Sequence, residues 1–198
     1  MLKKQKYIII ELMNSFESKP NLYLDIDGVI YPFASDEETE EQERASVPRN
    51  EIARRLGSTC LNIVWCSSRS ERSVSFTAGT EDMKELGDTR ILDTRNVEDT
   101  RPWAKRKLEA IRWRITPSYF GEKAIKTWIE TKFDAISADQ KDNPLPFVWV
   151  DDDLNDEITH LVETDFANQP HLLIRPTSTV GISIDELTNI EAFAKRFD

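Results

Sequence analysis

Two aspartates, Asp25 and Asp27, lie one residue apart where the apolar sequence LYLDIDGVI of residues 22–30 turns polar. Gly28 follows them and permits the tight turn that two neighbouring carboxylates require. Further along the chain, polar residues again follow apolar runs directly: Ser67, Ser68 and Arg69 after LNIVWC, and Asp151, Asp152 and Asp153 after PFVWV. Carboxylates, hydroxyls and a cation in this pattern favour one kind of chemistry, phosphoryl transfer.

An aspartate can attack phosphorus to give an aspartyl-phosphate, which divides a difficult hydrolysis into two easier steps. A second carboxylate can protonate the leaving oxygen and then deprotonate the attacking water. Mg²⁺ prefers oxygen ligands and often takes one or two carboxylates, so Asp25 and an aspartate after PFVWV suit it. A serine, an arginine and a lysine can hold the phosphate oxygens. The lysine is expected on the helix before PFVWV, as Lys123 or Lys126.

The elements that must position these residues alternate along the chain. Short apolar runs predict four strands, at residues 22–26, 61–66, 146–150 and 171–174. Helical patterns occupy residues 48–56, 104–115 and 125–133, and Ser183 with Glu186 forms a capping box that opens a last helix. Such alternation predicts an α/β fold, a Rossmann-like three-layer sandwich with a mainly parallel sheet. In such folds, ligands bind beyond the carboxyl ends of the strands.

Composition sets limits on the class of protein. The chain has 198 residues and 39% hydrophobic residues, which fits one globular domain over residues 1–198. The net charge of −10 disfavours a large sequence-independent grip on nucleic acid. Residues 101–114 nevertheless hold six basic residues against one acid, so a local phosphate-binding surface is compatible with the sequence.

The cellular setting is expected to be the cytoplasm. No apolar run reaches the roughly 20 residues that a membrane span needs, and residues near the N-terminus lack a signal-peptide pattern. Cys60 and Cys66 show no disulfide or metal spacing, so we expect buried thiols in a reducing compartment. No feature of the sequence points to a protein partner.

The order of these segments resembles the haloacid dehalogenase (HAD) superfamily of phosphohydrolases: DIDGV after an apolar run, a run ending in a hydroxyl residue, a lysine, and an apolar run followed by DD. The resemblance spans about residues 21–175. It implies that Asp25 is the nucleophile, Asp27 the general acid/base, Ser67 a phosphate ligand and Lys123 the cation that steadies the aspartyl-phosphate.

The same resemblance implies the metal ligands. Mg²⁺ would be held by Asp25, the backbone carbonyl of Asp27, and Asp152, while Asp151 orients or assists.

Two finer likenesses concern the substrate. Ser67-Ser68-Arg69 is similar to the S-G-R segment of polynucleotide 3′-phosphatase domains, where the arginine contacts the substrate phosphate and the lysine precedes a tryptophan by five residues, as Lys123 precedes Trp128. VWCSSR, FVWVDDD and LLIRPTSTVGIS also resemble phage and actinobacterial members grouped with RNA-repair proteins. Val29 replaces the usual threonine, and a serine replaces the glycine of S-G-R.

Plainer interpretations stay open at this point. Asp25 and Asp27 could merely end a strand and begin a turn. The three consecutive aspartates could form the N-cap and first turn of a helix near Leu154. Trp103 and Trp113 could stack on nucleobases or pack under a loop.

The sequence thus predicts a Mg²⁺-dependent phosphatase with a minimal cap, acting on a nucleotide or a nucleic-acid terminal phosphate. Residues 32–47 could form a small lid, and residues 70–120 a modest helical cover. The alternatives are a sugar-phosphate phosphatase and a non-catalytic metal- or partner-binding protein of the same fold.

Overall fold

The computed structural model of the chain describes residues 19–33, 46–69, 71–92, 94, 121–142 and 144–198, with the backbone alone for residues 121–127 and 142. Five parallel strands form one sheet in the order β3-β2-β1-β4-β5. The strands are β1 (Asn21–Leu24), β2 (Asn62–Trp65), β3 (Thr89–Ile91), β4 (Phe147–Val150) and β5 (His171–Ile174). The predicted parallel α/β sheet is confirmed.

The four strands expected from apolar runs are present, with ends that differ by two residues at most. β3 was not predicted, because its three residues, Thr89–Ile91, are too few to show a periodicity. It pairs with β2 at the edge of the sheet.

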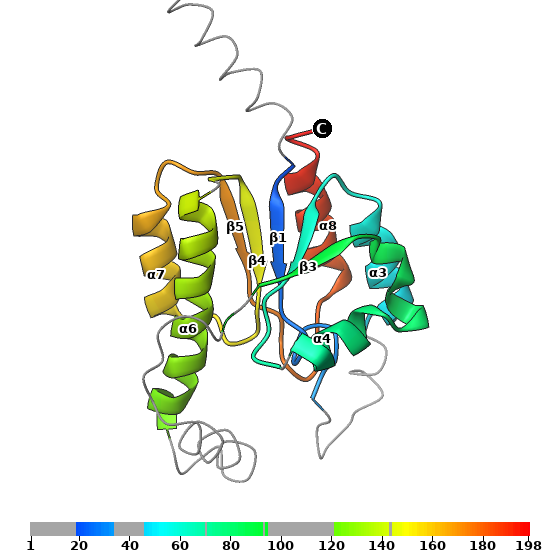
Figure 1. Cartoon of the computed structure of the whole chain (residues 1–198), viewed down its shortest axis with the longest axis horizontal. Helices are drawn as coiled ribbons and strands as arrows, with labels where there is room; N and C mark the ends of the chain where they lie inside the picture. Colours follow the sequence, from blue (N-terminus) through cyan, green and yellow to red (C-terminus); the bar gives the residue numbers. More distant parts are fainter. Residues whose placement is uncertain (1–18, 34–45, 70, 93, 95–120, 143) are drawn as a thin grey trace, which may run out of the picture.

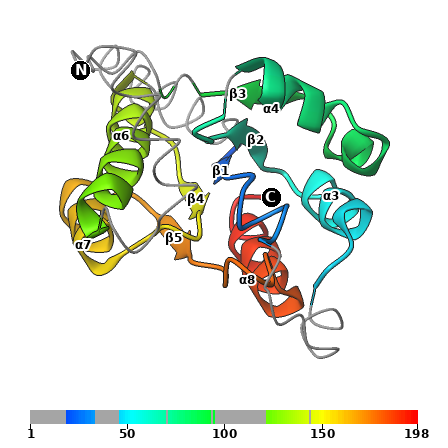
Figure 2. The same ribbon diagram turned by 90° about the horizontal axis from the view of Figure 1, so that it is seen from below.

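Helices cover both faces of the sheet (Figures 1 and 2). α6 and α7 lie on one face, and α3 and α8 lie on the other. The helices are α3 (Arg49–Gly57), α4 (Glu71–Ala78), the 3₁₀ helix η1 (Glu81–Leu86), α6 (Gly121–Asp142), α7 (Asp156–Asp165) and α8 (Ile184–Ala194). None of them, within the part of the chain that is described, is long and apolar enough to cross a membrane.

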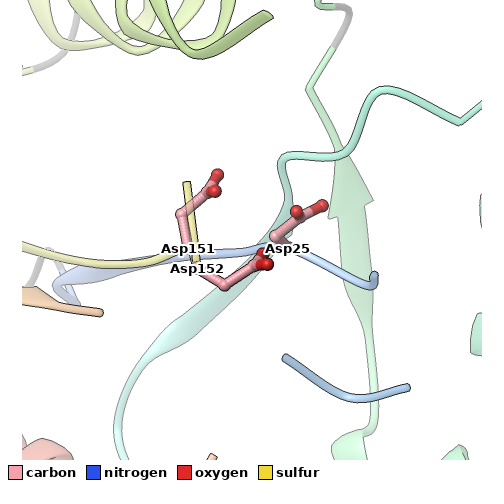
Figure 3. A group of neighbouring side chains, drawn as sticks. All are labelled: Asp25, Asp151 and Asp152. Carbon is pink, nitrogen blue, oxygen red and sulfur yellow. The ribbon is translucent and has the colours of Figure 1, made fainter. Parts of the chain in front are cut away.

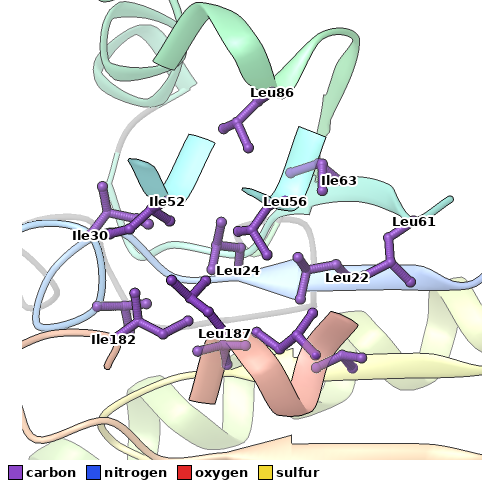
Figure 4. Close-up of a cluster of buried hydrophobic side chains, with 14 of the residues drawn as sticks. Leu22, Leu24, Ile30, Ile52, Leu56, Leu61, Ile63, Leu86, Ile182 and Leu187 are labelled. Atoms are coloured by element: carbon purple, nitrogen blue, oxygen red, sulfur yellow. The ribbon is translucent and has the colours of Figure 1, made fainter. Parts of the chain in front are cut away.

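Alternation along the strands builds two separate cores. In β1, Leu22 and Leu24 face α3 and α8, whereas Tyr23 faces α6 and α7. Figure 4 shows the first core, where Leu22 and Leu24 pack with Leu56 of α3 and Leu187 of α8. The central strands β1, β2 and β4 are therefore buried on both faces, as their continuous apolar runs predict.

Helix ends follow the expected signals. Pro48 is the N-cap of α3, and Gly57 is its last residue. Ser183 and Glu186 form the predicted capping box of α8.

α7 begins only at Asp156, with Asn155 as its N-cap. The interpretation of the three aspartates as N-cap and first turn of a helix is therefore wrong: they lie in the loop between β4 and α7.

Part of the expected cover over residues 70–120 is described. α4, η1 and β3 lie there, and η1 packs closely against α3 while β3 extends the sheet. These elements therefore build the core layers. Residues 95–120, with Trp103 and Trp113, and most of the proposed lid at 32–47 lie outside the described residues.

Candidate active site

The register of the sheet brings the predicted aspartates together. Leu24, the last residue of β1, pairs with Val150, the last residue of β4. The next residues, Asp25 and Asp151, therefore leave the sheet side by side. The Asp25 backbone N–H donates to the Val150 carbonyl at 3.1 Å, so this alignment continues past the strand ends.

Three carboxylates converge at this edge. One carboxylate oxygen from each of Asp25, Asp151 and Asp152 lies within 4.8 Å of the other two. Figure 3 shows these side chains meeting from the ends of β1 and β4. Asp151 is fully buried and Asp25 is 4% exposed, while Asp152 is partly exposed. The structure thus brings together the predicted nucleophile and both predicted acids after β4.

A buried lysine lies between two of these carboxylates. Lys132 Nζ donates to Asp25 Oδ2 at 2.8 Å and to Asp151 Oδ2 at 2.7 Å. The lysine is only 2% exposed. It comes from the middle of α6, which packs on the sheet through Ile129 and Ile136.

Sequence reasoning missed Lys132. The signal was available, since Lys132 follows Ile129 by three residues and precedes Ile136 by four, which places it on the buried face of the helix. Lys123 and Lys126 lie near the start of α6, where only the backbone is described. Nine residues separate Lys123 from Lys132, which is about 13 Å along a helix axis.

Burial and mutual repulsion raise the pKa of the clustered acids. Burial raises the pKa of Asp25 to about 6; Lys132 opposes the shift and Asp151 adds to it. Burial, with Asp153, Asp151 and Asp25 nearby, raises the pKa of Asp152 to about 8. Burial likewise raises the pKa of Asp151.

Lys132 shows the opposite balance. Burial lowers its pKa, but the carboxylates of Asp151 and Asp25 outweigh burial, and the pKa lies well above the usual value for lysine. Lys132 is therefore a fixed positive charge, and it neutralises only one of the three clustered carboxylates when all are ionised.

The residues present fit a divalent cation. Asp25 Oδ1 is buried and has no hydrogen-bond partner within the described residues. An all-oxygen ligand set with excess negative charge suits Mg²⁺. Asp25 and Asp152, the two side chains predicted as ligands, both lie in this cluster, and their binding of the ion stays a prediction. The carbonyl of Asp27, also predicted as a ligand, stays a prediction.

Gly28 creates the space that this cluster occupies. Its backbone has a φ of +72°, which glycine adopts without strain. A Cβ at this position would lie 2.1 Å from Asp152 Oδ2. Gly28 therefore allows both the turn after Asp27 and the close approach of Asp152.

Asp27 lies beside the cluster in an ion pair. Arg69 Nε donates to Asp27 Oδ2 at 2.9 Å, and Arg69 Nη2 donates to Asp27 Oδ1. This pairing raises the pKa of Arg69. The predicted acid/base residue and the predicted phosphate-binding arginine are thus in direct contact.

Ser67 is buried at the end of β2, and its Oγ accepts a hydrogen bond from the Arg69 backbone N–H at 3.3 Å. Thr94, which the sequence did not single out, donates from Oγ1 to the Ser67 carbonyl at 3.2 Å. It is buried after β3 and fixes the loop after β2 from the neighbouring strand. Ser68 is exposed.

A family model describes most of this chain. The model of the HAD domain in Swiss Army Knife RNA repair proteins matches residues 21–186. The chain belongs to this family. The predicted resemblance to HAD proteins linked to RNA repair is therefore confirmed. A search of curated proteins and a search of solved structures each found no match.

The matched range contains every side chain of the site described above, from Asp25 after β1 to the aspartates after β4. In this HAD domain, the buried carboxylate cluster is the arrangement expected of a metal site.

The raised pKa values predict how the stability of this HAD domain depends on pH. Without divalent cations, Asp25 and Asp152 of the folded protein stay protonated to higher pH than in the unfolded chain, where both carboxyl groups ionise at about pH 4. The free energy of unfolding should therefore fall as the pH rises towards about 8. Urea unfolding in EDTA at several pH values measures this slope.

Asp152→Asn should flatten the slope, whereas Asp88→Asn, an exposed acid before β3, should leave it unchanged. An unfolding free energy that rises over the same pH range, in the wild-type HAD domain, would contradict the raised pKa values.

Two glycines provide a matched test of the contact with Asp152. Gly87 has a φ of +71° and a ψ of −144°, with open space around its Cβ position, so Gly87→Ala should cost only the backbone strain, about 1–3 kcal/mol of unfolding free energy. Gly28→Ala should cost clearly more and should also weaken Mg²⁺ binding, because Asp152 must move. Thermal unfolding with and without Mg²⁺ measures both effects. Equal losses in the two variants would show that the contact does not matter.

Proposed function

We propose that this HAD domain is a Mg²⁺-dependent phosphatase that hydrolyses a phosphomonoester through an aspartyl-phosphate on Asp25, with a nucleotide or a nucleic-acid end as substrate. The observation that carries the proposal is the pairing of buried Asp25 with Lys132, next to Asp151 and Asp152. The family description, which refers to RNA repair proteins, supports the choice of substrate.

Asp25 has the features of a nucleophile. Lys132 holds Asp25 Oδ2 and opposes protonation of the carboxyl group, whose pKa of about 6 leaves most of it ionised at neutral pH. Asp25 Oδ1 has no hydrogen-bond partner within the described residues. In the first step an Asp25 oxygen bonds to phosphorus, the bond from phosphorus to the leaving oxygen breaks, and Asp27 gives that oxygen a proton.

The second step reverses the proton transfer. Water attacks phosphorus and gives a proton to Asp27, the bond between phosphorus and Asp25 breaks, and inorganic phosphate leaves. Asp25 and Asp152 would hold Mg²⁺, which when bound offsets the repulsion between Asp25 and the phosphate dianion. Asp151 keeps Lys132 oriented through its 2.7 Å hydrogen bond.

The ion pair between Asp27 and Arg69 sets a condition for this cycle. Both oxygens of Asp27 accept hydrogen bonds from Arg69, so the intact pair fixes this carboxylate on the arginine and occupies the arginine that would bind the phosphate. Substrate phosphate offers Arg69 a competing anion of higher charge. In the proposed cycle, Arg69 leaves Asp27 and binds the phosphate, which Ser67 and the backbone around Ser68 also bind. Asp27 is then free for proton transfer.

Asp25→Asn tests the nucleophile directly. The amide is close in shape but cannot form the acyl phosphate, so kcat on an aryl phosphate should fall by at least about a thousandfold. EDTA should also abolish wild-type activity, and Mg²⁺ should restore it. Activity that is indifferent to both changes would exclude this mechanism.

A panel of phosphorylated oligonucleotides, mononucleotides and sugar phosphates then tests the substrate, and a preference for sugar phosphates would remove the nucleic-acid assignment.

Substitution of Lys132 and substitution of Lys123 should affect stability and activity differently. Lys132→Met leaves two buried carboxylates facing each other and should cost about 3 kcal/mol or more of unfolding free energy, along with most of the activity. Lys123→Met, a like substitution on the same helix, should keep more of both the unfolding free energy and the activity than Lys132→Met does.

Urea unfolding of both variants measures the loss of stability, and aryl-phosphate assays measure the loss of activity. Lys132→Arg, which keeps the positive charge, should retain more stability than Lys132→Met. If Lys123→Met abolishes activity while Lys132→Met does not, Lys123 supplies the cation, as first expected from the sequence.

A further inference from the structure

Two arginines contact one tyrosine ring beside the site. The guanidinium carbon of Arg49 lies 4.7 Å from the centroid of the Tyr31 ring, and that of Arg69 lies 5.7 Å from it. These are cation–π distances. Arg49 is the first residue of α3, Tyr31 belongs to the loop after β1, and Arg69 follows β2. Three separate segments thus converge in one arginine–tyrosine cluster.

The loop after β1 fixes this cluster next to the acid/base residue. Tyr31 N donates to the Ile26 carbonyl at 2.9 Å, and Gly28 N donates to the Tyr31 carbonyl at 2.9 Å. This closes a tight loop that holds Tyr31 near Asp27. Arg69 binds Asp27 and also contacts Tyr31, so the arginine–tyrosine cluster connects Asp27 with Arg49.

The outer arginine is accessible. The Arg49 side chain is 42% exposed. Its Nη2 lies 3.0 Å from Oδ2 of Asp82 in η1, whose side chain is 45% exposed. Such exposed pairs contribute little stability and exchange readily. A guanidinium carries five N–H donors in a plane, so one contact leaves others for a phosphate. Stacking on Tyr31 orders the side chain before any ligand arrives.

We propose that Arg49, positioned by Tyr31, binds a second phosphate of a nucleic-acid strand, next to the terminal phosphate that Asp25 attacks. This inference rests on the proposed function and narrows its substrate class. Arg69 serves the terminal phosphate and Arg49 the adjoining phosphodiester, so the cluster selects strands over monophosphates. Contacts to backbone phosphates fix the position and register of a strand without reading its sequence.

Arg49→Gln tests the inference through a ratio. The ratio of kcat/KM for a phosphorylated oligonucleotide to kcat/KM for an aryl phosphate should fall about tenfold, the effect of one lost charge-assisted hydrogen bond. Arg54→Gln removes the same charge from an exposed position of α3, where Arg54 pairs with Glu51, and should leave the ratio unchanged. Asp82→Asn removes the competing carboxylate and should raise the ratio.

Binding to the Asp25→Asn protein provides a second readout. Fluorescence anisotropy with a labelled phosphorylated oligonucleotide, repeated at several salt concentrations, gives the number of phosphates contacted. Adding Arg49→Gln should reduce the slope of log affinity against log salt by about 0.7, the value for one contact with a single strand. Adding Arg54→Gln in its place should not.

The outcomes separate the two proposals. If no phosphatase activity is found on any substrate, the proposed function fails. If aryl-phosphate hydrolysis is intact and Arg49→Gln changes neither the ratio nor the salt slope, only the second phosphate site fails. A nucleoside bisphosphate as competitor identifies the source of the second phosphate: inhibition weaker than by a phosphorylated dinucleotide supports a strand, and stronger inhibition overturns the strand in favour of a bisphosphate.

Discussion

Excess negative charge buried at the carboxyl edge of the sheet constrains this whole structure. Asp25, Asp151 and Asp152 each place one carboxylate oxygen within 4.8 Å of the others. Ionised carboxylates cannot be removed from water at tolerable cost unless cations compensate them. Lys132 supplies one positive charge from within the chain. Burial, together with the neighbouring carboxylates, raises the pKa of Asp152 to about 8, and the surplus of negative charge suits a divalent cation.

Ordinary packing positions these groups. The register of β1 and β4 brings Asp25 and Asp151 out of the sheet together. Ile129 and Ile136 anchor α6 on the sheet, and this anchoring directs Lys132 between the two carboxylates. The site therefore inherits its rigidity from the hydrophobic layers on which it stands. The acidic net charge of the chain gives no general attraction for nucleic acid, so the proposed recognition of a strand rests on local arginines such as those around Tyr31.

Residues that carry a local signal were predictable from the sequence. The four apolar strands, the capping box of α8 and the acids after β1 and β4 each show in a few consecutive residues. β3 is a three-residue edge strand whose place depends on pairing with β2. Lys132 was missed because a lysine is expected at the surface by default, and only the apolar residues around it reveal its burial. The ion pair of Asp27 with Arg69 joins residues 42 positions apart and has no local signal.

The central claim is that Asp25 forms a covalent bond to phosphorus. Rapid acid quenching of a reaction with a phosphorylated oligonucleotide, followed by borohydride reduction and peptide mass spectrometry, tests it directly. An aspartyl-phosphate is reduced to homoserine, whereas a free aspartate is not. We predict homoserine at position 25 and none at positions 27, 151 or 152, with trapping dependent on Mg²⁺. Turnover without homoserine at position 25, or with homoserine at another aspartate, would contradict this account.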